Sequence, residues 1–245
     1  MAALQDRMEV RADLPTTGGW QRCGDLLADP ARFDVWRKLL GEWLRDGFGE
    51  APERTTAGFV MSWYLHVPAF TGALLLHHER RVPMLRPGEL AFRLCADRPH
   101  PEGVAVLGDE FYCLPGDPDA DRPEATVVAD ERALAAVLRA RYTAHAAQFV
   151  QAYAPLSRLG RRMLWAAATD ALDSTLWWAG LYAGDEEAGV ADAQLVLDEH
   201  YPPLTASTRL RQTGDGWARR RESCCFSYLL PEQPLCEGCP RTCRR

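Results

Sequence analysis

The spacing of apolar residues divides the chain into two helical regions with a strand-like region between them. Asp29-Pro30 has the composition of a helix start, with Asp29 as the N-cap and Pro30 at the first helical position. Apolar residues then recur every three or four positions from Phe33 to Leu44, before glycines at positions 47 and 49. The first region is therefore predicted to begin with an amphipathic helix.

Residues 55–78 form a second helical segment that contains no Asp, Glu, Lys or Arg. These 24 residues are long enough to span a bilayer. However, they include Pro68, Gly72 and three histidines, so we predict a buried helix to about His66, a break at Pro68 and a second helix. Peripheral contact with a membrane stays open as an alternative.

A strand-like texture begins near residue 82. Residues 90–94 alternate between apolar and polar or small side chains, which is the period of a strand with one buried face. Gly108-Asp109 separates two further short segments, 104–107 and 110–114, which we interpret as a hairpin. The region from about 82 to 129 is therefore predicted to be a small antiparallel sheet.

Helical spacing returns at Asp130 and predicts three more helices. The first is expected to end at Pro155, the second to be capped by Ser157 and to run to about residue 183, and the third to cover about 186–199. Helices that are segregated from a small sheet in this way indicate the α+β class. We expect a helix-rich body over residues 1–205 and a separate C-terminal segment over 206–245.

Charge sets that C-terminal segment apart. The whole chain has a formal net charge of -6, which argues against nucleic acid as a partner. From Arg209 to the end, the chain contains eight arginines and four acidic residues, a local net charge of +4 that leaves -10 for the rest.

Residues 1–15 have no apolar run of the secretory type, so we expect a cytoplasmic protein, in which cysteine clusters are more often metal sites than disulfides.

Four of the eight cysteines lie within 16 residues of this segment: Cys224, Cys225, Cys236 and Cys239. The Cys236-x-x-Cys239 half, with Gly238 in its turn, suits zinc and iron–sulfur clusters equally well. Adjacent cysteines point to opposite faces of an extended backbone, so Cys224 and Cys225 converge only if the chain bends. This spacing fits a single zinc ion poorly and a larger binuclear cluster better, although structural zinc and disulfides remain alternatives at this level.

The pattern Arg-x-x-x-Cys-Cys-x10-Cys-x2-Cys-Pro, from Arg220 to Pro240, resembles the C-terminal region of the ferric siderophore reductases of the FhuF type. Tyr228 also matches that region. The resemblance implies a [2Fe–2S] cluster that is held by Cys224, Cys225, Cys236 and Cys239 and forms the redox centre. Cys243, three residues beyond Pro240, departs from the pattern and competes for the last ligand position.

The resemblance further implies an oxidoreductase that reduces a ferric siderophore to its Fe(II) form and so releases iron in the cytoplasm. The chain has no G-x-G-x-x-G motif after a strand and no P-loop, so we expect an external electron donor: a reductase, a ferredoxin or a small reductant. Its expected location is cytoplasmic, with peripheral contact at the inner face of the membrane as an option. The alternatives are a zinc-binding structural or interaction protein and a siderophore-binding relative without redox activity.

Residues outside the cysteine cluster are less informative. Aromatic residues at helical spacing are usually core, yet five side chains are also candidates for the wall of a substrate site: Trp63, Tyr64, His66, Trp177 and Trp178. No substrate-binding residue is assigned. His77-His78 is interpreted as a helix end with solvated imidazoles, and Cys23, Cys95 and Cys113 as buried structural thiols. Six arginines of the C-terminal segment, residues 206–245 (the tail), either offset the charge of a cluster or form a solvated surface: Arg219, Arg220, Arg221, Arg241, Arg244 and Arg245.

Overall fold

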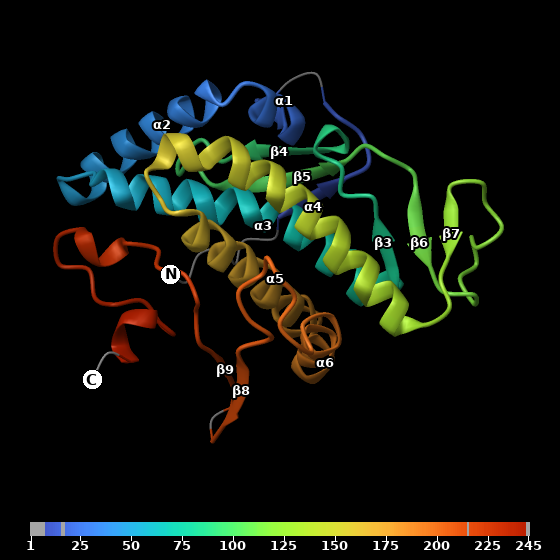
Figure 1. Ribbon diagram of the computed structural model, residues 1–245. Helices are drawn as coiled ribbons and strands as arrows, with labels where there is room; N and C mark the ends of the chain where they lie inside the picture. Colours follow the sequence, from blue (N-terminus) through green and yellow to red (C-terminus); the bar gives the residue numbers. More distant parts are fainter. Residues whose placement is uncertain (1–7, 16–17, 215, 244–245) are drawn as a thin grey trace.

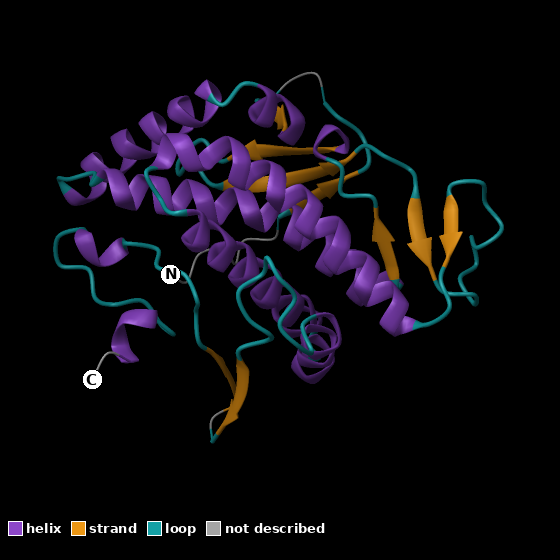
Figure 2. Ribbon diagram, viewed as in Figure 1, coloured by secondary structure: helices purple, strands orange, loops and turns teal. Residues whose placement is uncertain are grey.

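The computed structural model describes residues 8–15, 18–214 and 216–243, and within this part helices dominate over short strands (Figures 1 and 2). The elements are, in chain order, β1 (Glu9–Arg11), β2 (Trp20–Arg22), α1 (Cys23–Ala28), α2 (Ala31–Phe48), α3 (Glu53–Glu79), β3 (Arg81–Pro83), the 3-10 turn η1 (Pro87–Glu89), β4 (Leu90–Leu94), β5 (Pro101–Val106), β6 (Phe111–Cys113), β7 (Ala125–Val127), α4 (Glu131–Ser157), α5 (Arg161–Ala183), α6 (Glu186–Val196), β8 (Leu210–Thr213), β9 (Gly216–Arg219), η2 (Ser227–Leu229) and η3 (Pro240–Cys243). The α+β class is confirmed.

Helix α3 runs through the centre of the molecule and is buried on all sides for most of its length. The predicted break at Pro68 is wrong, because α3 continues through this residue. Proline removes one backbone hydrogen bond from a helix, but here burial of the turns on both sides outweighs that loss. Within the described residues, α3 is long and apolar enough to cross a membrane, yet 78% of its most apolar window is buried inside the protein, as in a core helix.

The strands form three small sheets, of which two are mixed. The largest has the order β1-β5-β4-β2, with β1 parallel to β5, and the second has the order β3-β6-β7, with β6 parallel to β7. The predicted hairpin across Gly108-Asp109 is therefore wrong, since β5 pairs with β4 and β6 pairs with β3. Strands of three residues, such as β1, β2 and β7, are too short for an alternating pattern to reveal them.

Several helix ends differ from those predicted from prolines and capping residues in the sequence. Helix α2 begins at Ala31 with Pro30 as its N-cap residue, and Asp29 makes no side-chain cap. The Asp130 carboxylate does cap α4 by accepting from the Ala133 amide at 2.8 Å. Helix α4 passes through Pro155 and ends at Ser157, which precedes α5 rather than capping it. Helix α6 ends at Val196, three residues earlier than predicted.

The C-terminal segment lies at the opposite end of the molecule from the β3-β6-β7 sheet (Figure 1). After the β8–β9 hairpin it is mostly loop, with η2 and η3 as single short turns (Figure 2). This loop runs past α3 and α5, which carry the groups that hold it in place. Division of the chain at residues 205 and 206 stays a prediction.

Candidate functional site

One buried carboxylate on α5, Asp170, holds the chain just before the adjacent cysteines. Its Oδ1 accepts from the Arg219 guanidinium at 2.7 Å and from the Glu222 amide at 2.9 Å, while Oδ2 accepts from the Ser223 amide and hydroxyl at 2.8 and 2.6 Å. Burial would raise the pKa of Asp170, but the charges of Arg219 and Arg221 and these hydrogen bonds hold it below its usual value. The carboxylate is therefore ionised and fully engaged with the tail.

Helix α3 supplies the second contact with this loop. The Thr55 hydroxyl donates to the Phe226 carbonyl at 2.9 Å. At Gly58, one turn further on, a Cβ atom would lie 2.9 Å from the Phe226 ring and 3.0 Å from the Cys225 carbonyl oxygen. The absence of a side chain at Gly58 thus allows the adjacent cysteines to lie directly against α3.

The backbone bends immediately after the two adjacent cysteines, as their convergence requires. Phe226 has the left-handed conformation, with φ 59° and ψ 13°, and its amide donates to Cys224 Sγ at 3.4 Å. Ser227 Oγ lies 3.1 Å from Cys225 Sγ. Each sulfur of the pair therefore has a polar neighbour from the turn that follows it.

The Cys236–Cys239 half is a tight turn in which the Cys239 amide donates to the Cys236 carbonyl at 3.1 Å. Gly238 has φ +64°, and a Cβ there would clash with the Arg219 carbonyl oxygen, so the expected need for glycine is confirmed. The Gly238 carbonyl accepts from the Arg221 amide at 2.9 Å. This hydrogen bond joins the two cysteine-bearing halves of the segment.

The structure brings two of the tail cysteines into contact, one from each half, and the charges of the tail cysteines act on one another. Cys225 Sγ and Cys236 Sγ are 3.5 Å apart, close to the ~3.8 Å between two thiolates that share one tetrahedral metal at ~2.3 Å. Their hydrogen bond lowers the pKa of Cys225 and raises that of Cys236. Burial, followed by the charges of Cys225 and Cys239, raises the pKa of Cys224.

This donor set fits a binuclear cluster. The seven cysteines whose side chains are described are all free thiols. No three His, Cys, Asp or Glu side chains in the described part of the chain converge on one ion position. A [2Fe–2S] cluster takes its four thiolates in pairs spread over two irons, which matches a close pair with two further thiols nearby.

Of the six tail arginines, Arg221 contacts a cysteine, and Arg219 shares its Asp170 partner. Arg221 is 7% exposed, and its Nη1 lies 3.7 Å from Cys236 Sγ while its Nε lies 3.8 Å from Asp170 Oδ2. Burial alone would lower the pKa of Arg221, but Asp170 and the thiols Cys225 and Cys236 raise it. The Arg219 side chain is 10% exposed and pairs with Asp170. Arg221 is therefore placed to offset negative charge on the sulfurs, whereas Arg219 neutralises the carboxylate that anchors the tail.

The other basic residues of the tail play no such part in the described structure. Arg220 is exposed, and Arg241 lies over the Tyr228 ring, 4.2 Å from its centroid. Arg244 and Arg245 lie outside the described residues. Cys243 ends η3, but its side chain is not described, so its competition with Cys239 stays a prediction.

A cavity of about 430 Å³ adjoins the cysteines between α3, α5 and the tail. Four of the five aromatic candidates line it: Trp63, His66, Trp177 and Trp178. The fifth, Tyr64, faces the opposite side of α3, where it stacks on Phe149 at 4.5 Å and its hydroxyl lies 3.1 Å from His145 Nε2. The cavity is also lined by Arg221 and Cys236 and is thus continuous with the cysteine site.

His66 forms part of the cavity floor and is uncharged near neutral pH. Burial is the main cause that lowers its pKa to about 4. Its Nδ1–H donates to the Ser62 carbonyl at 2.6 Å, and its ring stacks on Trp178 at 5.7 Å. This leaves Nε2 as an acceptor, 3.4 Å from the Ser174 hydroxyl.

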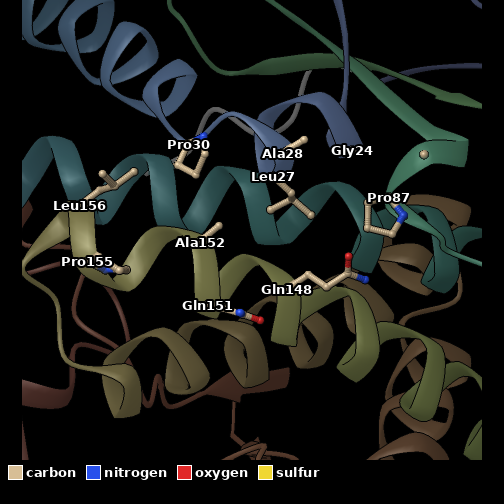
Figure 3. Close-up of a pocket in the computed structure, with 11 residues that line it drawn as sticks. Gly24, Leu27, Ala28, Pro30, Pro87, Gln148, Gln151, Ala152, Pro155 and Leu156 are labelled. Carbon is tan, nitrogen blue, oxygen red and sulfur yellow. The ribbon is translucent and has the colours of Figure 1, made fainter.

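A larger hollow, of about 710 Å³, lies between α1, α4 and the η1 turn (Figure 3). Small and apolar residues such as Leu27, Ala152 and Pro87 line it together with Gln148 and Gln151. None of its lining residues is titratable or carries a thiol. The hollow therefore offers no group for redox or acid–base chemistry.

The remaining sequence expectations have mixed outcomes. His77 and His78 lie at the end of α3, as predicted, and His78 is exposed. The expected solvation is wrong for His77, because its side chain is 9% exposed and its Nδ1 lies 2.8 Å from the buried Asp192 carboxylate. Cys23 and Cys113 are fully buried, as predicted. Cys95 is only half-buried, because it lies in the connection that follows β4, so the prediction of a buried thiol is wrong there.

Comparison with known proteins agrees with this geometry. The profile of the FhuF 2Fe-2S C-terminal domain matches residues 221–241, which include all four tail cysteines. No curated protein matches the chain. The chain is therefore an iron–sulfur protein whose C-terminal segment carries a [2Fe–2S] cluster. Within that class the match confirms its resemblance to the siderophore-related FhuF family over the tail.

Proposed function

We propose that this protein is a ferric siderophore reductase whose [2Fe–2S] cluster is held by Cys224, Cys225, Cys236 and Cys239. One observation carries the proposal. Thiols from two separate stretches of the tail, those of Cys225 and Cys236, meet beside a cavity large enough for part of a small chelate, and the thiol of Cys236 lies in its wall. A site that only stabilised the fold would not need this opening.

The chemistry follows from the properties of iron. When bound, a [2Fe–2S] cluster supplies one electron at a time. A siderophore binds Fe(III) tightly through hard oxygen ligands, and a substrate iron that accepts one electron becomes Fe(II), which these oxygens hold more weakly. Iron is then free to leave the chelate.

The chain's own residues prepare the site for this reaction. Arg221 places positive charge beside the sulfurs, which favours the more negatively charged, reduced form of the site. Asp170 holds Arg221 and Arg219 in place. The Phe226 amide and the Ser227 hydroxyl stabilise negative charge on Cys224 and Cys225.

We place the reaction in the cytoplasm, with peripheral contact at the inner face of the membrane as an option. The electron donor is external and of one-electron type: a reductase, a ferredoxin or a small reductant. The absence of a dinucleotide-binding motif in the sequence supports this choice.

Anaerobic purification with visible spectroscopy and iron and sulfide analysis tests the cofactor ligands. Serine at any of the four tail cysteines is expected to abolish the visible absorption, whereas Cys243→Ser and Cys95→Ser are expected to retain it. A colourless protein with stoichiometric zinc would overturn the proposal. Loss of the cluster in Cys243→Ser alone would overturn the assignment of Cys239.

The reductase activity is tested separately with the reduced protein, ferric ferrioxamine B and a colour-forming Fe(II) trap. We expect ferrous iron to appear with the wild-type protein and not with Cys225→Ser. A protein that binds the chelate but yields no ferrous iron would be a siderophore-binding relative without redox activity.

A further inference from the structure

We propose that the cavity between α3, α5 and the tail is the docking site for the ferric chelate, with Trp63, Trp177 and Trp178 as its wall and Cys236 as the thiol nearest to the bound iron. This inference rests on the proposed function and assigns it a substrate site.

The first argument is access to the cysteines. Cys224, Cys225 and Cys239 are 7%, 3% and 2% exposed, whereas Cys236 is half-buried and lines the cavity. Electron transfer becomes slower as the distance grows, so the substrate iron should approach the site where a ligand sulfur reaches the surface. The cavity provides that approach at Cys236.

The second argument is the chemistry of the walls. Indole rings from two helices form one apolar surface, and the Trp177 Nε1–H is fixed by the Glu186 carboxylate at 2.8 Å. At the rim, Leu181 and Tyr182 are 41% and 52% exposed, although large apolar side chains usually avoid solvent. A siderophore presents methylene or aryl groups around its metal, and such a surface would cover these side chains.

An unused hydrogen-bond acceptor points to the same ligand. His66 lines the cavity, and its Nδ1–H donates to the Ser62 carbonyl, which leaves Nε2 as an acceptor. The nearby Ser174 hydroxyl donates to the Asp170 carbonyl at 2.7 Å and so does not occupy this acceptor. A chelate that offers an amide or ammonium hydrogen would satisfy it.

Charge narrows the class of chelate. Around the cavity, Arg219 and Arg221 are matched by Asp170 and Glu237, so the excess charge is that of an oxidised cluster, about -2. An uncharged or cationic ferric chelate should therefore bind better than a trianionic one. In the reaction one electron converts its Fe(III) to Fe(II), no covalent bond of the protein changes, and the external one-electron donor restores the reduced protein.

The test measures binding separately from activity. Gallium(III) desferrioxamine B, a cationic chelate that cannot be reduced under these conditions, is titrated calorimetrically into the oxidised, cluster-loaded protein. We expect Trp178→Ala to weaken binding at least tenfold and Tyr182→Ala, a substitution at the exposed rim, to weaken it threefold or more. Trp20→Ala is the matched control, because it removes a half-buried indole from β2 that does not line the cavity. The trianionic gallium complex of a tris-catecholate is expected to bind at least tenfold more weakly than the cationic one.

Iron content and circular dichroism establish that each variant is folded and loaded. If the wild-type protein reduces ferric ferrioxamine B but Trp178→Ala and Tyr182→Ala bind the gallium chelate as tightly as it does, the docking site is elsewhere and the proposed function stands. If a loaded wild-type protein neither binds the gallium chelate nor reduces the ferric one, the docking site and the proposed function both fail.

Discussion

Replacement of Asp170 by Asn should release the cysteine-bearing tail from the body of the protein. The carboxylate is 3% exposed and accepts four hydrogen bonds from the tail, one of them from the buried Arg219 guanidinium. Asn keeps the shape but loses the charge and turns one acceptor into a donor that faces the Ser223 or Glu222 amide. Removal of one partner from a buried ion pair typically costs about 3–5 kcal/mol. A loss of about 3 kcal/mol would raise the population of detached tail roughly a hundredfold.

Two measurements follow this detachment. Limited proteolysis with mass analysis reports cleavage between about residues 206 and 240, and the decay of visible absorption in the presence of an iron chelator reports loss of the cluster. Both rates should rise strongly in Asp170→Asn. The matched control is Asp192→Asn, since Asp192 is also 3% exposed and pairs with Arg80 at 2.6 Å and with His77 at 2.8 Å, but on α6 and without contact to the tail.

Asp192→Asn should lower the free energy of unfolding of the whole protein without selective cleavage of the tail. The reasoning is refuted if Asp170→Asn keeps wild-type rates of tail cleavage and cluster loss. It is also refuted if the two variants accelerate tail release equally, because the effect would then reflect general destabilisation.

Three further predictions concern the surroundings of the site. Gly58→Ala should destabilise the protein by about 1–3 kcal/mol in urea unfolding and lower its iron content, because the new methyl group meets the loop that carries the adjacent cysteines. The control Gly47→Ala should be neutral or slightly stabilising, because no atom lies near its Cβ. Equal effects of the two substitutions would contradict this prediction. His145 and His66 have pKa values of about 4 because they are buried, so between pH 6.5 and 4 the unfolded chain binds their protons and the folded protein does not. The free energy of unfolding should therefore decrease as the pH is lowered from 6.5 to 4, by up to about 1.4 kcal/mol per pH unit for each histidine. His145→Gln should remove the contribution of His145 to this pH dependence, which urea unfolding at several pH values measures. An unchanged pH dependence in this variant would contradict the prediction. Arg221→Gln should lower the reduction potential of the cluster by tens of millivolts, up to about 100 mV, because the anionic site loses a neighbouring positive charge. Spectroelectrochemical titration measures this potential. An unchanged or raised potential would contradict the role given to Arg221.

Local signals in the sequence located the cysteine site of the tail, and the family resemblance, not the spacing alone, favoured an iron–sulfur cluster over zinc or disulfides. The spacing of Cys224, Cys225, Cys236 and Cys239 and the turn glycine at Gly238 are properties of neighbouring residues, and a tight turn or a metal site requires them at close range along the chain. The helical segments could also be predicted, because an amphipathic helix repeats its pattern of apolar residues over several turns.

Elements that depend on distant partners were missed or misplaced. Pro68 suggested a break in α3 because its local cost is visible, whereas the burial that compensates for it comes from elements elsewhere in the chain. Strands β1 and β2 were missed, since three residues carry no periodic pattern and only pairing with β5 and β4 makes them strands.

The sequence by itself determined which atoms can hold iron in this protein, and the tertiary structure decided how those atoms are held and from which side they are reached. Asp170 and Gly58 lie in helices and have no local signature of their role, because their partners in the tail are at least 49 residues away in the chain. Trp63 and Trp178 also have no local signature of a role in the site, because each recurs with other apolar residues at the spacing of a helix core. Only the packing of α3 against α5, with the tail across both, places these indoles around a cavity that opens onto Cys236.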